Sequence, residues 1–140
     1  MLADLSLPTP DPESLHFHDG RGTFRPRGRY SLVDAVDLVS SAIAQCRARS
    51  LSLLLIDATG LVGLPVPTLV DRFLMVEDWA TESRGTVTVA PVVHEEYIHP
   101  RKFGVKVALK FGLICDVYTS EREASAWLSE ASGDAGRSGA

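Results

Sequence analysis

The sequence contains few cysteines and no long hydrophobic run. Cys46 and Cys115 are the only cysteines among 140 residues, and neither has the spacing of a metal-binding or redox motif. We expect both to be buried free thiols in a reducing, cytoplasmic environment. No stretch reaches the roughly 18 consecutive apolar residues of a membrane span, so we expect no membrane insertion. The first residues lack a basic region followed by an apolar one, so we expect no secretory signal.

Recognisable motifs of catalysis are also missing. The chain has no glycine-rich phosphate loop, no nucleophile elbow and no Cys/His cluster. We therefore expect a protein that is not an enzyme and has no cofactor. The net charge of −4 argues against non-specific binding of nucleic acid, so no nucleic-acid partner is expected. An apolar content of 45% is typical of one globular domain, which we place at residues 14–131, with flexible tails at 1–13 and 132–140.

The hydrophobic pattern predicts an α/β fold around residues 51–60. This stretch, LSLLLIDATG, is typical of a strand buried on both faces that ends at Asp57. Two short strands joined by the turn residues Asp19-Gly20-Arg21-Gly22 are expected before it as a hairpin, and helices and strands alternate after it. The predicted order is ββαβαβαβα, with one mixed, mostly parallel five-stranded sheet in a single layer and four helices. The predicted strands span 15–18, 23–27, 51–57, 86–93 and 114–118, and the helices begin at Ser31, Pro67, Pro100 and Ser120.

Four segments in this order resemble the SpoIIAA-like superfamily, the fold of STAS domains. They are RGRYS at 27–31, LLLIDATGL at 53–61, VTVAPVV at 87–93 and VYTSEREASAWL at 117–128, the last being similar to a bacterial branch. The resemblance implies a non-enzymatic, cytosolic regulatory module that binds a protein partner or associates with itself. Relatives that act as phosphoswitches carry an Asp-Ser pair after the central strand. This chain has no such pair, and Thr68 is the nearest hydroxyl, so the switch is not carried over.

A second hypothesis is a carrier or sensor of a small anionic or lipid-like ligand. In an open α/β sheet, ligands bind outside the carboxyl ends of the strands, and backbone N–H groups at helix N-termini favour anions. The loop after the central strand and the N-terminus of the helix at Pro100 would then form the site. The candidate ligand-binding residues are Asp57, Thr59, Gly60, Thr68, His94, Arg101 and Lys102. The simpler alternatives are that Asp57 caps its own turn and that Lys102, Lys106 and Lys110 form a solvated helix face.

Two further groups of residues suggest a metal site or an interface. His94 and His99 are five residues apart, which does not match the i, i+4 pair of a helical zinc motif, so no metal site is expected even with His16 and His18. Four apolar residues are candidates for a partner or dimer interface: Leu64, Val66, Met75 and Trp79. The alternative for these four residues is that they cover the core.

Overall fold

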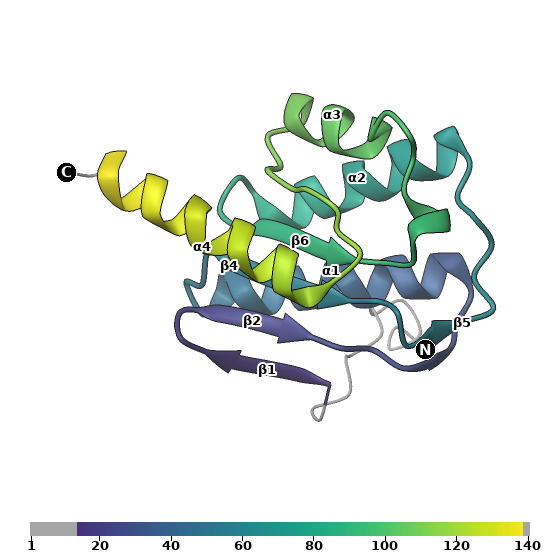
Figure 1. Cartoon of the computed structure of the whole chain (residues 1–140), viewed down its shortest axis with the longest axis horizontal. Helices are drawn as coiled ribbons and strands as arrows, with labels where there is room; N and C mark the ends of the chain where they lie inside the picture. Colours follow the sequence, from purple (N-terminus) through teal and green to yellow (C-terminus); the bar gives the residue numbers. More distant parts are fainter. Residues whose placement is uncertain (1–13, 139–140) are drawn as a thin grey trace, which may run out of the picture.

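The computed structural model describes residues 14–138, and its centre is a four-stranded sheet (Figure 1). The strand order is β1-β2-β4-β6. These strands span Leu15–His18, Arg21–Phe24, Leu53–Asp57 and Thr88–Val92. β1 pairs antiparallel with β2, and the other two pairings are parallel. The α/β class, the N-terminal hairpin and the parallel pairing after it are therefore confirmed.

The hairpin between β1 and β2 is tighter than the sequence predicts. Asp19 and Gly20 both have positive φ, 50° and 77°, as the two central residues of a type I′ turn require. A two-residue turn lets pairing resume at once, so His18 lies opposite Arg21. β2 therefore begins two residues before the predicted Thr23.

A second, two-stranded sheet forms where none was predicted. β3 (Gly28–Arg29) pairs in parallel with β5 (Leu61–Val62). The N–H of Gly28 also donates to the carbonyl of Gly60, at 3.1 Å. This pairing holds the chain that follows β4 against the chain that follows β2, and so fixes one side of the loop at 58–67.

The predicted fifth strand at 114–118 is wrong as a continuous strand. Only two parallel bridges join this segment to β6, Val89 with Cys115 and Val92 with Tyr118. Between them, the carboxylate of Asp116 accepts a hydrogen bond from the N–H of Val117 at 2.8 Å. A local side-chain bond of this kind competes with a strand ladder for the backbone.

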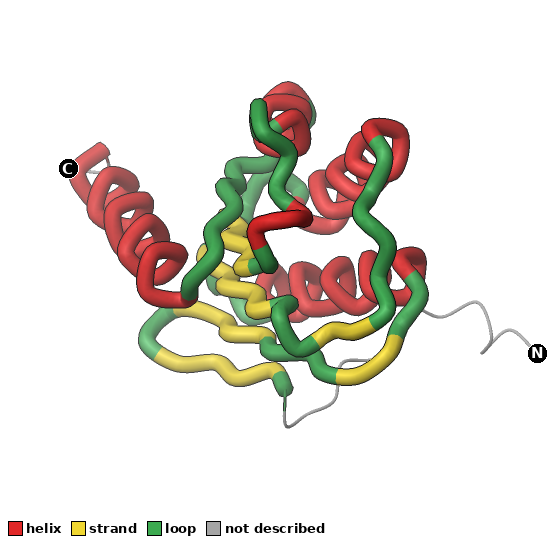
Figure 2. Tube along the Cα trace, turned by 45° about the vertical axis from the view of Figure 1, so that its right-hand side comes forward, coloured by secondary structure: helices red, strands yellow, loops and turns green. Residues whose placement is uncertain are grey.

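Helices cover the two faces of the sheet unequally. α1 (Leu32–Ala48) and α2 (Leu69–Ser83) lie on one face, and α4 (Glu121–Ser138) lies on the other (Figure 2). Alternate residues of β4 serve the two faces, Leu54 and Ile56 on the side of α1 and Leu53 and Leu55 on the side of α4. α3 (Phe103–Lys110) packs on α2, and a single 3₁₀ turn, η2 (Glu95–Tyr97), precedes it.

The first turn of α2 differs from the prediction. Thr68 is the N-cap: its hydroxyl accepts from the N–H of Asp71, whose carboxylate accepts from the N–H of Thr68. This capping box starts the helix later than Pro67. The helical spacing predicts an inner face made of Leu69, Val70, Phe73, Val76, Trp79 and Ala80. This prediction is wrong in part, because Leu69, Val70 and Phe73 are exposed. Periodicity alone did not show which side of α2 faces the core, because this helix carries apolar residues on two sides.

The last helix extends beyond the predicted end of the domain. The backbone of α4 stays helical to Ser138, whereas a tail was expected from Ser132. Its packing on the sheet uses Ala124 and Leu128, and each later residue extends the helix for one further backbone hydrogen bond. The predicted tail at 1–13 lies outside the described residues.

Candidate ligand-binding cavity

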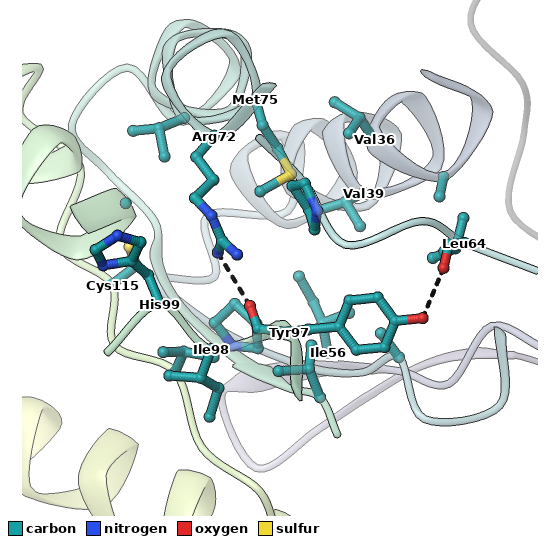
Figure 3. Close-up of a pocket in the computed structure, with 18 of the residues that line it drawn as sticks. Val36, Val39, Ile56, Leu64, Arg72, Met75, Tyr97, Ile98, His99 and Cys115 are labelled. Atoms are coloured by element: carbon teal, nitrogen blue, oxygen red, sulfur yellow. Dashed lines mark hydrogen bonds between the residues drawn. The ribbon is translucent and has the colours of Figure 1, made fainter. Parts of the chain in front are cut away.

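An apolar cavity of about 160 Å³ lies between α1, α2 and the carboxyl ends of β4 and β6. Val36 and Val39 line it from α1, and Ile56 lines it from β4 (Figure 3). Met75 and Trp79 line it from α2. The site therefore occupies the place at the strand ends where a ligand was predicted, and helices and loops both contribute to its wall.

Residues 94–99 form one wall of this cavity. The hydroxyl of Tyr97 donates to the carbonyl of Leu64 at 2.7 Å, which ties η2 to the loop before α2 (Figure 3). His94, Ile98 and His99 line the cavity beside Tyr97. The segment was expected to be a plain polar loop. Its single 3₁₀ turn and the Tyr97 tie make it a fixed wall of the cavity.

Arg72 is one of several polar residues that line the cavity, together with His94, His99, Lys102 and Asp116. Its guanidinium is half-buried and donates from Nη1 to the carbonyl of Tyr97 at 3.0 Å. Burial lowers the pKa of Arg72 below its ordinary value, yet a guanidinium stays charged in proteins. Among residues 14–131, no carboxylate forms a salt bridge with Arg72. The cavity thus holds a positive charge that the described part of the chain leaves uncompensated.

Arg47 is a second half-buried arginine between α1 and α2, and it can be compared with Arg72. Its Nε donates to the carbonyl of Glu82 at 2.7 Å, and its Nη2 lies 3.5 Å from the carboxylate of that residue. Arg47 thus has a counter-ion where Arg72 has a single neutral carbonyl. The contrast identifies Arg72 as the group in the cavity best placed to bind an anion.

The sequence reasoning did not select Arg72, although a signal was present. Arg72 lies four residues before Val76 and seven before Trp79, both of which are buried. A charged residue on the buried stripe of a helix is the kind of exception that marks a site. Counting only apolar residues along the stripe concealed it.

Two of the predicted ligand-binding residues, His94 and Lys102, do line the cavity. Lys102 is already compensated, because its Nζ lies 2.5 Å from the Asp116 carboxylate and 3.4 Å from the carbonyl of Val117. His99, which was not selected as a ligand-binding residue, also lines the cavity, and its Nδ1 accepts from the N–H of Arg101 at 3.1 Å. Arg72 therefore provides the free positive charge that was predicted for Lys102.

The other predicted ligand-binding residues lie outside the cavity lining. Asp57 caps its own turn, because its Oδ1 accepts from the N–H of Thr59 at 3.0 Å and from the Thr59 hydroxyl at 2.6 Å. Gly60 lies against the backbone of Pro26, so a Cβ at this position would require a neighbouring atom to move. Thr68 caps α2. Arg101 is exposed to solvent. The structure confirms the simpler interpretation of Asp57.

The four predicted interface residues are divided between core, cavity and surface. Trp79 is buried, and its Nε1 donates to the carbonyl of Val36 at 3.2 Å. Met75 is half-buried against the core, and Leu64 lines the cavity. Val66 is exposed. The surface prediction is thus wrong for Trp79, because its indole fills the seam between α1 and α2, where core cover was the stated alternative.

No group of three or more His, Cys, Asp or Glu side chains in the described part of the chain could hold a metal ion. The described helices include none with the length and apolar character needed to cross a membrane. Burial raises the pKa of the cavity-lining thiol of Cys115 to about 12, so it stays protonated at neutral pH.

Comparison of the chain with family models, with curated proteins and with solved structures finds no match. The SpoIIAA-like assignment therefore stays a prediction from the sequence.

Proposed function

We propose that this protein is a non-enzymatic binding module for a small molecule with an apolar body and a carboxylate. The observation that carries the proposal is the half-buried guanidinium of Arg72, which has no salt-bridge partner among residues 14–131, in a mostly apolar cavity. Binding sites of this type combine an apolar lining with a few polar groups that fix the orientation of the ligand. The proposal sharpens the predicted small anionic ligand and keeps the predicted cytoplasmic, SpoIIAA-like setting.

The size of the cavity limits the apolar body. Its volume is about 160 Å³, and dry apolar cavities of about 150 Å³ bind benzene. A phenyl ring or a short branched chain fits this space, whereas a long acyl chain would extend out of it. Of the lipid-like ligands expected from the sequence, the proposal therefore includes only carboxylic acids with a short apolar body.

The charge of Arg72 supplies the discrimination between an acid and its neutral analogue. A guanidinium has five N–H donors and recognises a carboxylate with two parallel bonds. The carbonyl of Tyr97 occupies one nitrogen, Nη1, so donors remain for a ligand. A hydrogen bond to a charged group contributes about 1.5–3 kcal/mol, which corresponds to about tenfold or more in Kd.

Calorimetric titration of the whole chain with phenylacetate tests this proposal, with neutral 2-phenylethanol as the matched ligand. We expect the acid to bind about tenfold or more tightly than the alcohol. Arg72→Met should remove this preference by weakening the acid alone. Arg47→Met is the control variant, because Arg47 is half-buried between the same two helices but is paired with Glu82.

Two results would contradict the proposal. One is equal affinity of the unaltered chain for phenylacetate and for 2-phenylethanol. The other is no detectable binding of phenylacetate or of hexanoate, a second short acid. Amide chemical-shift changes on titration provide the location, and we expect them at residues 94–99 and in the first half of α2.

A second candidate function, a SpoIIAA-like module that acts by binding a protein, is favoured by a different observation. Most of the exposed large apolar side chains lie on α2, on α3 or in the segments next to these two helices, which pack against each other. Contiguous apolar surface of this kind marks interaction sites. This surface lies on the outward sides of the two helices, so it does not compete with the cavity.

A further inference from the structure

The exposed apolar residues are concentrated on one surface, which we call the α2–α3 patch. It comprises Val66, Leu69, Val70, Phe73, Leu74, Leu109, Phe111 and Ile114, whereas Val33 and Val62 are the other large apolar residues exposed among residues 14–138. The rings of Phe73 and Phe111 meet edge to face, with centroids 5.4 Å apart. α2 and α3 pack against each other, and the Phe73–Phe111 contact joins the exposed residues of the α2 side to those of the α3 side.

The two edges of the α2–α3 patch carry opposite charges. Glu77 and Asp78 are exposed on α2, three and four residues after Leu74. Lys106 and Lys110 are exposed on α3, on either side of Leu109. Asp34 and Asp78 both raise the pKa of Asp37, in addition to burial, which shows that α1 adds to the negative field on the α2 edge. The patch is therefore apolar in the middle, acidic on the α2 side and basic on the α3 side.

From this charge pattern we infer that the α2–α3 patch binds a second copy of this chain in a two-fold symmetric dimer. In a two-fold interface the same patch is used on both copies and must be complementary to itself. A two-fold axis running along the seam between α2 and α3 places the acidic edge of each copy on the basic edge of the other. The same operation places Phe73 and Phe111 of the two copies at the centre, where dimer interfaces are most apolar.

The acidic edge also distinguishes a second copy from an anionic membrane surface. A membrane-binding helix face needs an excess of Lys and Arg around its apolar residues. Here Glu77 and Asp78 border Leu74 directly, and the whole chain has a net charge of −4. The inference deepens the second candidate function by naming its partner, and it does not rest on the ligand cavity.

Sedimentation velocity of the whole chain over a concentration series tests the inference. Two double variants reverse one edge each, Glu77→Lys with Asp78→Lys, and Lys106→Glu with Lys110→Glu. Each variant alone places like charges opposite each other at both contacts, so we expect its dimer to weaken about tenfold or more. An equimolar mixture of the two variants restores opposite charges at both contacts, so we expect a mixed dimer of about the original strength.

Native mass spectrometry with one variant labelled with ¹⁵N identifies the mixed dimer. All four substituted residues are exposed, so circular dichroism and thermal unfolding should show each variant folded as the unaltered chain. A monomer at every concentration of the unaltered chain would overturn the inference. So would a dimer that both variants leave intact, or a mixture that fails to restore association.

Discussion

The two halves of α2 belong to one helix, yet they differ in how far their large side chains are buried. In residues 76–83, Val76, Trp79 and Ser83 are buried, and the Ser83 hydroxyl both donates to the carbonyl of Val87 and accepts from its N–H. In residues 69–75, the large apolar side chains of Val70 and Leu74 are exposed, at 67% and 51%. The second half packs into the core. The first half leaves apolar side chains exposed, and it carries Arg72, which has no salt-bridge partner among residues 14–131.

Both proposed sites border the first half of α2. Arg72 lines the cavity, whereas Val70, Phe73 and Leu74 are exposed and belong to the α2–α3 patch. If every residue in the first half of α2 were packed in the core, none would remain to line the cavity or to form the α2–α3 patch. Exposing apolar residues for binding lowers stability least in a part of a helix that contributes little to the core. The first half of α2 is such a part.

The largest expected difference between the halves is in stability. Trp79→Ala removes a buried indole together with its hydrogen bond to Val36 and should lower the free energy of unfolding by about 3–5 kcal/mol. Phe73→Ala removes an aromatic ring that is 40% exposed and should cost less than about 1 kcal/mol. Urea unfolding at concentrations where the chain is monomeric measures both values. Equal costs would show that the first half is part of the core.

Local patterns explain how much of the fold could be predicted. The apolar run of β4, the turn residues that follow His18 and the Ser120 hydroxyl, which accepts from the N–H of Glu123, act within a few residues, and the sequence indicates each of them. The β3–β5 pair is two residues long on each side and joins segments 33 residues apart, so no local pattern marks it. The loss of the strand at 114–118 depends on Asp116, which is bound by Lys102 from another segment.

The site was predictable in position but not in its residues. The carboxyl ends of β4 and β6 do border the cavity, and His94 and Lys102 do line it. The proposed anion-binding charge comes from Arg72, which the sequence analysis did not select. Whether a basic residue has a counter-ion depends on tertiary neighbours: Lys102 has Asp116, and Arg72 has no salt-bridge partner within residues 14–131.

A pair of arginine substitutions sharpens the comparison further. Arg47→Met breaks hydrogen bonds to the carbonyl and the carboxylate of Glu82 and should lower the free energy of unfolding by about 1.5 kcal/mol. Arg72→Met removes a half-buried charge that has only one neutral partner, so stability should stay within about 0.5 kcal/mol or rise. Thermal unfolding of the ligand-free variants measures both effects. A loss for Arg72→Met as large as that for Arg47→Met would assign Arg72 a structural role.

The N-cap gives the most local effect. Thr68→Ala removes the hydroxyl that accepts from the N–H of Asp71 at 3.0 Å and should cost about 1 kcal/mol. Thr68→Ser keeps that acceptor and should restore stability. Because few side chains of residues 69–75 are held in the core, we expect the lost cap to speed amide hydrogen exchange there and to leave residues 79–83 unchanged. Equal acceleration along all of α2 would mean that the two halves open as one unit, and the distinction between them would then describe surface chemistry alone.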